Sequence, residues 1–214
     1  MKRAFLVVAT AAVAATALTT ACTNLPRSRD LGNPNVAAIT IAQQVCSDCH
    51  GVTGNSVSPN FPNLAAQTSP YLIAQLKGFK SHNRADPAGF EYMWGLSRNL
   101  SDAQITGLAA YYATQRPIAN PGRSDATRAS VGKQIFETGV AAKNIPACMT
   151  CHGPAAQGNE TFPRLAGQHA DYVIKQLIIF QRTDERPEGT VMKTIAHDLA
   201  LDDIKNLAAY VQSL

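Results

Sequence analysis

The chain has 214 residues, enough for one medium domain or two small ones, and its 45% hydrophobic content is that of a folding sequence. It carries 19 basic and 15 acidic residues, a formal charge of +4. Without Lys2 and Arg3, which lie in a segment expected to be removed, the charge is 17 − 15 = +2. Because no cluster of basic residues accompanies this small excess, we exclude nucleic-acid binding from the expected functions.

Residues 1–21 have the pattern of an export signal. Lys2 and Arg3 form a positive start, Phe5–Leu18 is an apolar stretch, and Thr19–Ala21 are small residues at the end of it. The apolar stretch is short and rich in alanine and threonine, so a retained membrane anchor is the weaker alternative.

Cys22 is the fifth cysteine, and the other four belong to two repeated motifs. An odd cysteine after an export signal has two explanations here: lipid attachment at a new N-terminus, or loss together with the signal. The lipoprotein pattern is imperfect because its leucine, Leu18, lies one residue too early. Residues 22–33 are polar and contain proline and glycine, as expected of a tether.

The rest of the chain is a duplication. The repeated segments are CSDCHG at 46–51 and CMTCHG at 148–153, FPNLAAQ at 61–67 and FPRLAGQ at 162–168, YLIAQL at 71–76 and YVIKQL at 172–177, and LAAY at 108–111 and 207–210. The offset drifts only from 102 to 99, so both copies are expected to share one fold. We place one domain at 34–114, a linker with two prolines and a glycine at 115–123, and a second domain at 124–214.

The elements expected at the start of each domain are helices. Asn33-Pro34 has the residue types of a helix start, and the helix is predicted to run to about Val45. Its counterpart is predicted from about Asp125 to Thr138, ending at Gly139. A second helix begins at Ser69-Pro70, with an apolar stripe on one face.

The last element of each domain is also a helix. In the first domain the segment Ser101–Gln104 is a capping box, Leu100 and Ile105 can form a hydrophobic staple, and the helix is expected to reach about Thr114. The matching helix starts near Ala200 without a serine cap. Because neither domain contains an alternating strand pattern, the predicted fold class is all-α. Domains of this size are marginal without a large apolar cofactor.

Both domains contain Cys-x-x-Cys-His, the attachment signature of c-type haem. The residues are Cys46, Cys49 and His50 in the first domain and Cys148, Cys151 and His152 in the second. Each thiol can add to one vinyl group of the porphyrin, which holds the following histidine under the iron. Zinc binding, a redox dithiol and disulfides are weaker alternatives, since none explains the histidine that follows each pair.

A haem iron needs a second axial ligand or an open position. Of the four methionines, Met1 is the start and Met149 lies inside the second attachment motif. Met93 and Met192 lie 43 and 40 residues after the histidine of their motif, each seven residues before the leucine that opens the last helix. Core packing is the alternative role of a methionine. We expect both to be iron ligands, because His/Met ligation closes the iron and suits electron transfer.

The remaining histidines do not repeat between the domains. His82, His169 and His197 are therefore expected to be surface or packing residues. A switch from methionine to histidine ligation at one of them has no supporting pattern.

The order of the motifs, from Cys-x-x-Cys-His-Gly through Phe-Pro-x-Leu-Ala-x-Gln and Tyr-(x)3-Gln-Leu to the methionine and Leu-Ala-Ala-Tyr, resembles the cytochrome c4 family of dihaem class I cytochromes. The resemblance covers about residues 34–214. It implies two class I cytochrome c domains about a pseudo-twofold axis and two covalently bound haem c groups. It also implies that Met93 and Met192 are the distal ligands.

The resemblance also implies neighbours of the haems. Pro62 and Pro163 would accept, through their carbonyls, a hydrogen bond from the second ring nitrogen of His50 and His152. Arg84 falls where the family often has a basic residue near a haem propionate. In the second domain either Arg182 or Arg186 could do this, and a solvated surface arginine is an equally good interpretation of all three.

The family implies a periplasmic electron carrier rather than an enzyme. Its expected partners are a donor such as a quinol-oxidising complex and an acceptor such as a terminal cytochrome c oxidase, with membrane attachment if Cys22 carries a lipid. A dihaem enzyme that turns over peroxide or thiosulfate, and a haem subunit of a membrane complex, are the alternatives. Trp94 beside Met93 and Lys193 beside Met192 predict unequal haem potentials.

Overall fold

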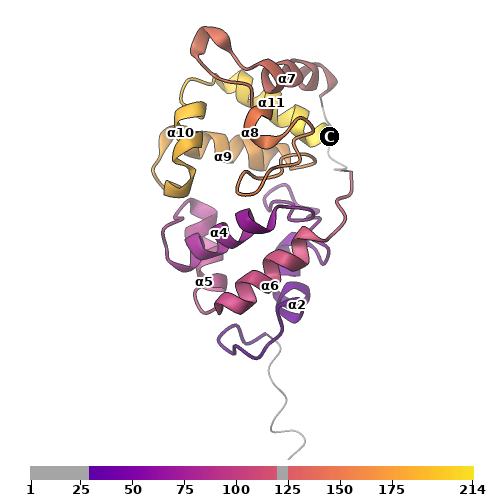
Figure 1. Ribbon diagram of the computed structural model, residues 1–214, viewed down its shortest axis with the longest axis vertical. Helices are drawn as coiled ribbons and strands as arrows, with labels where there is room; N and C mark the ends of the chain where they lie inside the picture. Colours follow the sequence, from indigo (N-terminus) through magenta and orange to yellow (C-terminus); the bar gives the residue numbers. More distant parts are fainter. Residues whose placement is uncertain (1–28, 120–124) are drawn as a thin grey trace, which may run out of the picture.

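The computed structural model describes residues 29–119 and 125–214, which form two helical units stacked end to end (Figure 1). We call residues 29–119 unit 1 and residues 125–214 unit 2. The predicted signal, Cys22, most of the tether and residues 120–123 of the linker lie outside the described residues. Within the described ranges there are no β-strands, only two isolated bridges, so the all-α fold class is confirmed.

Unit 1 is built from three longer helical segments and a short methionine-bearing one. Its elements are α2 (Ala38–Ile41), η1 (Ala42–Cys46), α3 (Ser47–His50), α4 (Ser69–Lys80), η2 (Gly89–Met93), α5 (Trp94–Ser97) and α6 (Asp102–Ala113). The first three follow one another without a break, so residues 38–50 form one helical segment with a π-turn in its middle. Single π-turns inside α-helices are frequent at functional sites.

Unit 2 repeats this plan with one difference. Its elements are α7 (Ala126–Thr138), η3 (Ala141–Lys143), α8 (Met149–His152), α9 (Ala170–Arg182), η4 (Pro187–Gly189), α10 (Thr190–Ala196) and α11 (Leu201–Ser213). Here the first helix ends at Gly139, as predicted, and a loop separates it from the attachment motif. Gly139 has φ +72°, a conformation that glycine adopts without strain.

The predicted start of the first helix at Asn33-Pro34 is wrong, because α2 begins at Ala38. The side chain of Asn33 accepts a hydrogen bond from the backbone of Asn35, which stabilises a turn. Gln104 of α6 donates to the backbone carbonyls of both Asn33 and Val36, at 3.0 Å each. These contacts hold residues 33–36 in turns, and the helix starts only after them.

The capping box of α6 is confirmed. Ser101 accepts from the backbone N–H of Gln104, and Gln104 accepts from the backbone N–H of Ser101 at 2.9 Å. In α11 the carboxylate of Asp203 accepts from the N–H of Ala200, at 3.0 Å, so only one half of such a box is formed. Leu100 and Ile105 are both buried, as the predicted staple requires.

The first and last helices of each unit cross closely over its core. In unit 2, Gly132 of α7 lies against the backbone of α11, where an added Cβ would be 1.9 Å from the carbonyl oxygen of Asn206. In unit 1 the small residue is on the other helix: a Cβ at Gly107 of α6 would be 2.6 Å from Ala38 of α2. The glycines therefore set how closely the two helices approach.

We expect Gly132→Ala to destabilise unit 2 by about 1–3 kcal/mol, because the helices must move apart to admit a methyl group. The control is Gly95→Ala in α5, where an added Cβ meets nothing within 4 Å and better helix propensity gives no loss of stability. Thermal unfolding followed by circular dichroism measures both. Equal stability of the two variants would contradict the close crossing.

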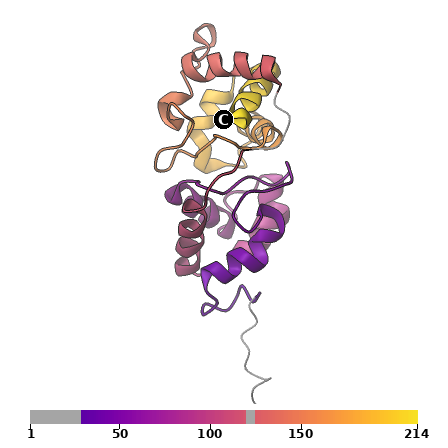
Figure 2. The same ribbon diagram turned by 90° about the vertical axis from the view of Figure 1, so that its right-hand side faces the viewer.

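The two units lie end to end (Figure 2). Reciprocal hydrogen bonds join them, as expected for units related by a pseudo-twofold axis. Gln67 of unit 1 donates to the carbonyl of Arg164 and accepts from its N–H, at 3.0 and 2.7 Å. Gln168 of unit 2 does the same with Asn63, at 3.0 and 2.8 Å. The last glutamine of each repeated Phe-Pro-x-Leu-Ala-x-Gln segment thus binds the partner segment of the other unit.

Candidate haem-binding sites

The attachment motif of unit 1 lies on one face of a helical segment. Cys46 ends η1, and Cys49 and His50 belong to α3. Residues three apart in a helix are neighbours on its surface, so the two thiols lie on the same side. Both cysteines are free and half-buried. This is the arrangement that two thioether bonds to one porphyrin require.

Unit 2 builds the same motif on a shorter helix. Cys148 is the N-cap of α8, and Cys151 and His152 lie within that helix. The two cysteines are again free and half-buried. Each thiol pair is followed by its own histidine in its own unit. In the described part of the chain, no three His, Cys, Asp or Glu side chains converge as metal ligands, so the geometry does not favour a zinc site.

The thiol of the first cysteine of each motif is less acidic than that of a free cysteine. Burial raises the pKa of Cys46 to about 11 and that of Cys148 to about 11. Reactive dithiols instead need a lowered pKa. A raised pKa at these cysteines does not favour a redox-active dithiol.

Both motif histidines are oriented by a backbone carbonyl. His50 Nδ1 donates to the carbonyl oxygen of Pro62 at 2.9 Å, and His152 Nδ1 donates to that of Pro163 at 2.9 Å. Burial lowers the pKa of both imidazoles, which keeps them neutral. With Nδ1 occupied, Nε2 is the nitrogen left to bind a metal. Such hydrogen bonds are the usual support of a metal-ligating histidine, and the histidines therefore fit a haem iron.

The methionines Met93 and Met192 lie on short helical segments that the sequence did not predict. Met93 is the last residue of the π-turn η2 and leads into α5, and both elements pack on α4. Met192 belongs to α10, which packs on α9, and its side chain contacts the apolar core of unit 2. Both methionines are half-buried. Each unit thus brings one methionine against the helix that follows its attachment motif.

Comparison with known proteins gives the same organisation. A cytochrome c family model matches residues 37–115 and again residues 129–214. Cytochrome c-552 of Acidithiobacillus ferridurans is 40% identical over 188 residues, which are 87% of this chain and 81% of the relative. Cytochrome c4 of Pseudomonas aeruginosa is 40% identical over 174 residues, 79% and 84% of the two chains. The crystal structure of reduced cytochrome c4 from Pseudomonas stutzeri matches with a TM-score of 0.75 at 36% identity, covering 86% and 99% of the chains.

The chain belongs to the cytochrome c4 family. The two Cys-x-x-Cys-His motifs fit two covalently bound haem c groups, one in each unit. A more distant relative is the thiosulfate dehydrogenase electron acceptor of Stutzerimonas stutzeri, which is 34% identical over 174 residues, 79% of this chain and 78% of that protein.

In this member of the cytochrome c4 family two arginines, Arg84 and Arg186, lie between the units. Arg84 Nε is 2.8 Å from the Asp86 carboxylate, and its Nη1 donates to Gln75. Both ionic side chains are almost completely buried, with side-chain exposures of 5% and 0%. Burial raises the pKa of Asp86, but the positive charges of Arg84 and Arg186 outweigh this and hold it below its usual range.

In unit 2 the arginine that lies buried in the junction, as Arg84 does in unit 1, is Arg186 rather than Arg182. Arg186 pairs with Glu188 at 2.8 Å and donates to Gln176, whereas Arg182 is an exposed residue at the end of α9. Arg186 also donates across the junction to Gln75, at 2.9 Å.

Gln176 of unit 2 completes this network by donating to Asp86 of unit 1 at 3.3 Å. The repeated Tyr-(x)3-Gln-Leu motif supplies these glutamines, so the motif marks an interface as well as a helix. Only the structure shows this, because the sequence pattern alone fits a helix core equally well.

The three non-repeated histidines differ in environment. His82 is exposed and lies edge-on to Phe90 and Trp94, with ring centroids 5.3 and 5.0 Å away. His197 is exposed. His169 is 5% exposed and lies in the junction between the units.

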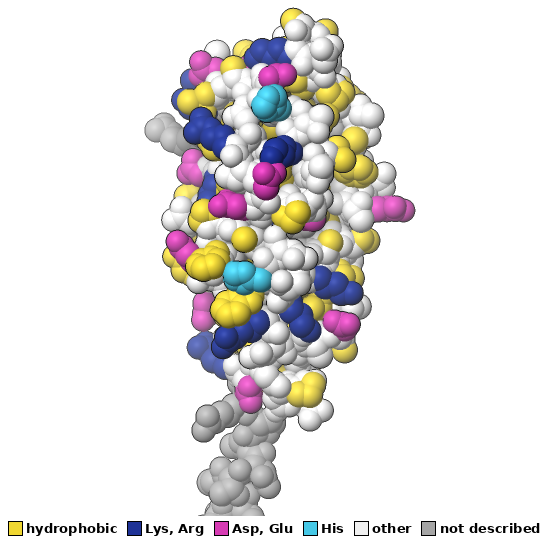
Figure 3. All heavy atoms as spheres, turned by 90° about the vertical axis from the view of Figure 1, so that its left-hand side faces the viewer, with side chains coloured by type: hydrophobic (Ala, Val, Ile, Leu, Met, Phe, Trp, Pro, Cys, Tyr) yellow, Lys and Arg dark blue, Asp and Glu magenta, His cyan; other side chains and the backbone are white. Residues whose placement is uncertain are grey.

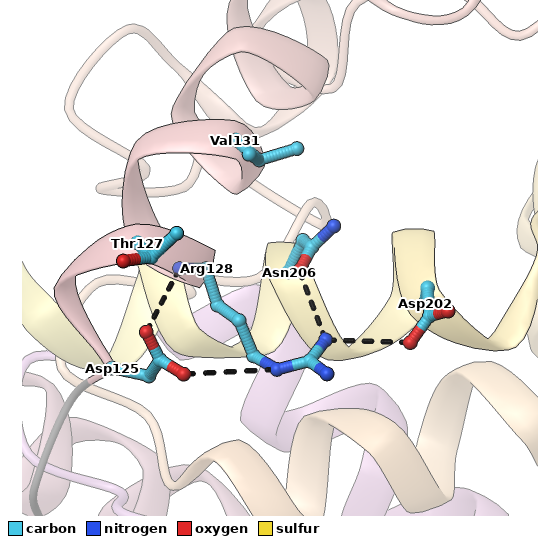
Figure 4. A pocket seen from close by; sticks show the side chains of 6 residues that line it. All are labelled: Asp125, Thr127, Arg128, Val131, Asp202 and Asn206. Carbon is cyan, nitrogen blue, oxygen red and sulfur yellow. Dashed lines mark hydrogen bonds and ion pairs between the residues drawn. The ribbon is translucent and has the colours of Figure 1, made fainter.

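A surface hollow lies between α7 and α11, and none of the predicted haem-binding residues lines it (Figure 4). Arg128 crosses it and donates to Asn206 at 3.1 Å and to Asp202 at 3.4 Å, with Asp125 3.8 Å away. The lining residues include no cysteine, histidine or methionine. Because the arginine already has anionic partners from the protein, the hollow is a helix contact rather than a ligand site.

The face that bears α5 and α10 mixes basic, acidic and apolar side chains, and neither sign of charge forms a continuous patch on it (Figure 3). Among the described residues, no helix is both long and apolar enough to cross a membrane.

Proposed function

We propose that this protein is a periplasmic dihaem electron carrier with His50 and Met93 as axial ligands in unit 1 and His152 and Met192 in unit 2. The observation that carries this proposal is the repeated histidine with Nδ1 bound to a proline carbonyl, in units that each present one half-buried methionine. Single electrons would pass from a respiratory donor, such as a quinol-oxidising complex, to an acceptor such as a terminal oxidase.

Each group of residues has its own task in this function. A bound haem supplies the one-electron iron couple. The cysteine pairs of each motif fix the porphyrin covalently, so that it is not lost from an exported protein. Pro62 and Pro163 set the orientation of the histidine rings. Met93 and Met192 would each supply the second iron ligand and so exclude oxygen or peroxide, which favours electron transfer over catalysis.

Arg84 and Arg186 are proposed as cationic neighbours of the haem propionates. Each lies in the junction between the units and is buried. Each is already paired with one carboxylate, Asp86 or Glu188, so the two arginines add little net charge to the junction. A propionate would share their remaining donors rather than replace these partners.

A second candidate donor is a thiosulfate dehydrogenase. The observation that favours it is the relative named as the electron acceptor of that enzyme, which aligns with most of both chains. In this role the protein still carries electrons and does not itself transform thiosulfate. Reduction of the purified protein by each donor, followed by stopped-flow absorbance, separates the two candidates.

The test of the function is the optical spectrum of protein expressed in a periplasm, with haem quantified per chain. We expect two covalent haems, both low-spin in the oxidised and reduced states, with the ferric methionine–sulfur band present. Replacing Cys46 and Cys49 by serine is expected to lower the stoichiometry to one covalent haem, and the Cys148/Cys151 pair should behave in the same way. A high-spin haem in the unaltered protein would overturn the ligand assignment and favour an enzyme.

A further inference from the structure

The residue after each interface glutamine is one of the positions at which the junction between the units is not reciprocal. This residue is Thr68 in unit 1 and His169 in unit 2. Both side chains contact a backbone carbonyl in the loop that follows the attachment motif of the other unit. The two carbonyls belong to residues at non-equivalent positions of these loops.

His169 reaches a serine that is bound to the attachment motif. Its Nε2 donates to the backbone carbonyl of Ser56 at 3.0 Å, and the two residues are 5% and 6% exposed. The hydroxyl of Ser56 donates to the carbonyl of Cys49 at 3.0 Å, with the carbonyl of Ser58 3.1 Å away as an alternative acceptor. The N–H of Ser56 is also held, by Asn63 at 2.8 Å.

The opposite path is not built in the same way. Thr68 donates to the carbonyl of Glu160, at 2.5 Å, in the loop after the second motif. The position in that loop equivalent to Ser56 is Gly158, because Gly54 and Ala156 make matching backbone hydrogen bonds two residues earlier. Glycine has no side chain to bind Cys151, and its N–H donates to His152 O at 2.8 Å instead. The connection through a side chain therefore exists in one direction.

We propose that His169 of unit 2 is a positioning residue for the haem site of unit 1, acting through Ser56 on the carbonyl of Cys49. Two hydrogen bonds and one serine residue then join unit 2 to the covalent attachment point of the other unit. Each loop is contacted from the other unit, by His169 or by Thr68, but only in the first loop does a side chain, that of Ser56, continue the connection to the attachment motif. The inference rests on the proposed haem attachment at Cys46 and Cys49.

The expected consequence is an unequal effect on the two haems. Without the contact, the loop that begins at Gly51 opens more often and admits water to the haem of unit 1. Water favours the more highly charged ferric form, so the midpoint potential of that haem falls. The haem of unit 2 has no such dependence on unit 1.

The test compares the His169→Thr holoprotein with the unaltered holoprotein. Threonine is the residue that unit 1 has at the matching position, Thr68. We expect the oxidised-to-reduced ratio of one haem at fixed potential to rise about fivefold, the effect of one lost hydrogen bond. For a one-electron couple this is a fall of ~40 mV, at about 59 mV per tenfold. Hydrogen exchange with peptide resolution assigns the unit: residues 51–57 should lose about fivefold protection, and residues 153–159 should lose none.

Three further variants complete the experiment. Ser56→Ala should reproduce the shift, and His169→Gln, whose amide can donate to the same carbonyl, should restore most of it. Thr68→Val is the matched control and should leave both potentials unchanged. If His169→Thr changes neither haem, or changes both equally, the inference is overturned while the proposed electron-carrier function stands. If the unaltered protein lacks two His/Met haems, the proposed function fails first.

Discussion

Met93→Ala is expected to remove the methionine–sulfur band of one haem and to lower its midpoint potential by on the order of 0.1 V or more, since axial ligands set haem potentials over about 0.8 V. Met192→Ala is expected to do the same to the other haem. The physical reason is that a thioether stabilises ferrous iron, and water or hydroxide in its place favours ferric iron. A spectroelectrochemical titration measures the band and both potentials together.

Met149 provides the matched control for this experiment. It is also half-buried, but it opens α8 inside the attachment motif and packs against the core of unit 2. Met149→Ala should therefore cost stability without removing either sulfur band. A surviving band in Met93→Ala or Met192→Ala would show that the methionine has a packing role and that another group binds the iron.

The same variants address the enzyme alternative. Opening one axial position creates a site that binds small ligands, so each alanine variant should bind cyanide or carbon monoxide at one haem more tightly than the unaltered protein does. Ready binding by the unaltered protein would instead mean that one iron is already open. In that case a peroxidase or a thiosulfate-oxidising enzyme would become the better assignment.

Arg84→Ala is expected to destabilise the holoprotein by about 3 kcal/mol, because it leaves the Asp86 carboxylate buried without its ion-pair partner. Asp86 has a side-chain exposure of 0%, and the remaining contacts with Gln176 and Arg186 compensate only in part. Urea unfolding followed by circular dichroism and by the Soret band measures the loss.

Two comparisons show whether burial is the cause. The exposed pair of Lys193 with Asp184 predicts a change below about 1 kcal/mol for Lys193→Ala. Arg84→Ala combined with Asp86→Ala should be less harmful than the arginine change alone, because no charge is then left unpaired. A double variant as unstable as the sum of the two single ones would contradict this explanation.

The same pair predicts a pH dependence. The pKa of Asp86 is lower in the folded protein than in the unfolded chain, where aspartate has a pKa of about 3.9. Its contribution to stability is therefore complete above that value and is lost as the pH falls through the lower, folded pKa. Acid unfolding of Arg84→Ala should begin at higher pH than that of the unaltered protein.

The elements that were predicted correctly depend on local chemistry. The capping box at Ser101 and the stop at Gly139 act over three or four residues, and both are present in the structure. The start of the first helix was wrong because Gln104, far along the chain, binds the carbonyls of Asn33 and Val36. Helix η2 was missed because a π-turn of five residues is too short to show a helical period.

By itself, the sequence determined the duplication, the all-α class and the two attachment motifs, because these depend on residues adjacent in the chain or repeated at a fixed offset. Only the tertiary structure decided which arginine of unit 2 corresponds to Arg84. It alone also showed that the glutamines of the repeated motifs join the units, and that His169 reaches Ser56 without an equivalent contact from Thr68. These features depend on which surfaces of two folded units meet, and residues about one hundred positions apart leave no pattern of spacing that predicts the contact.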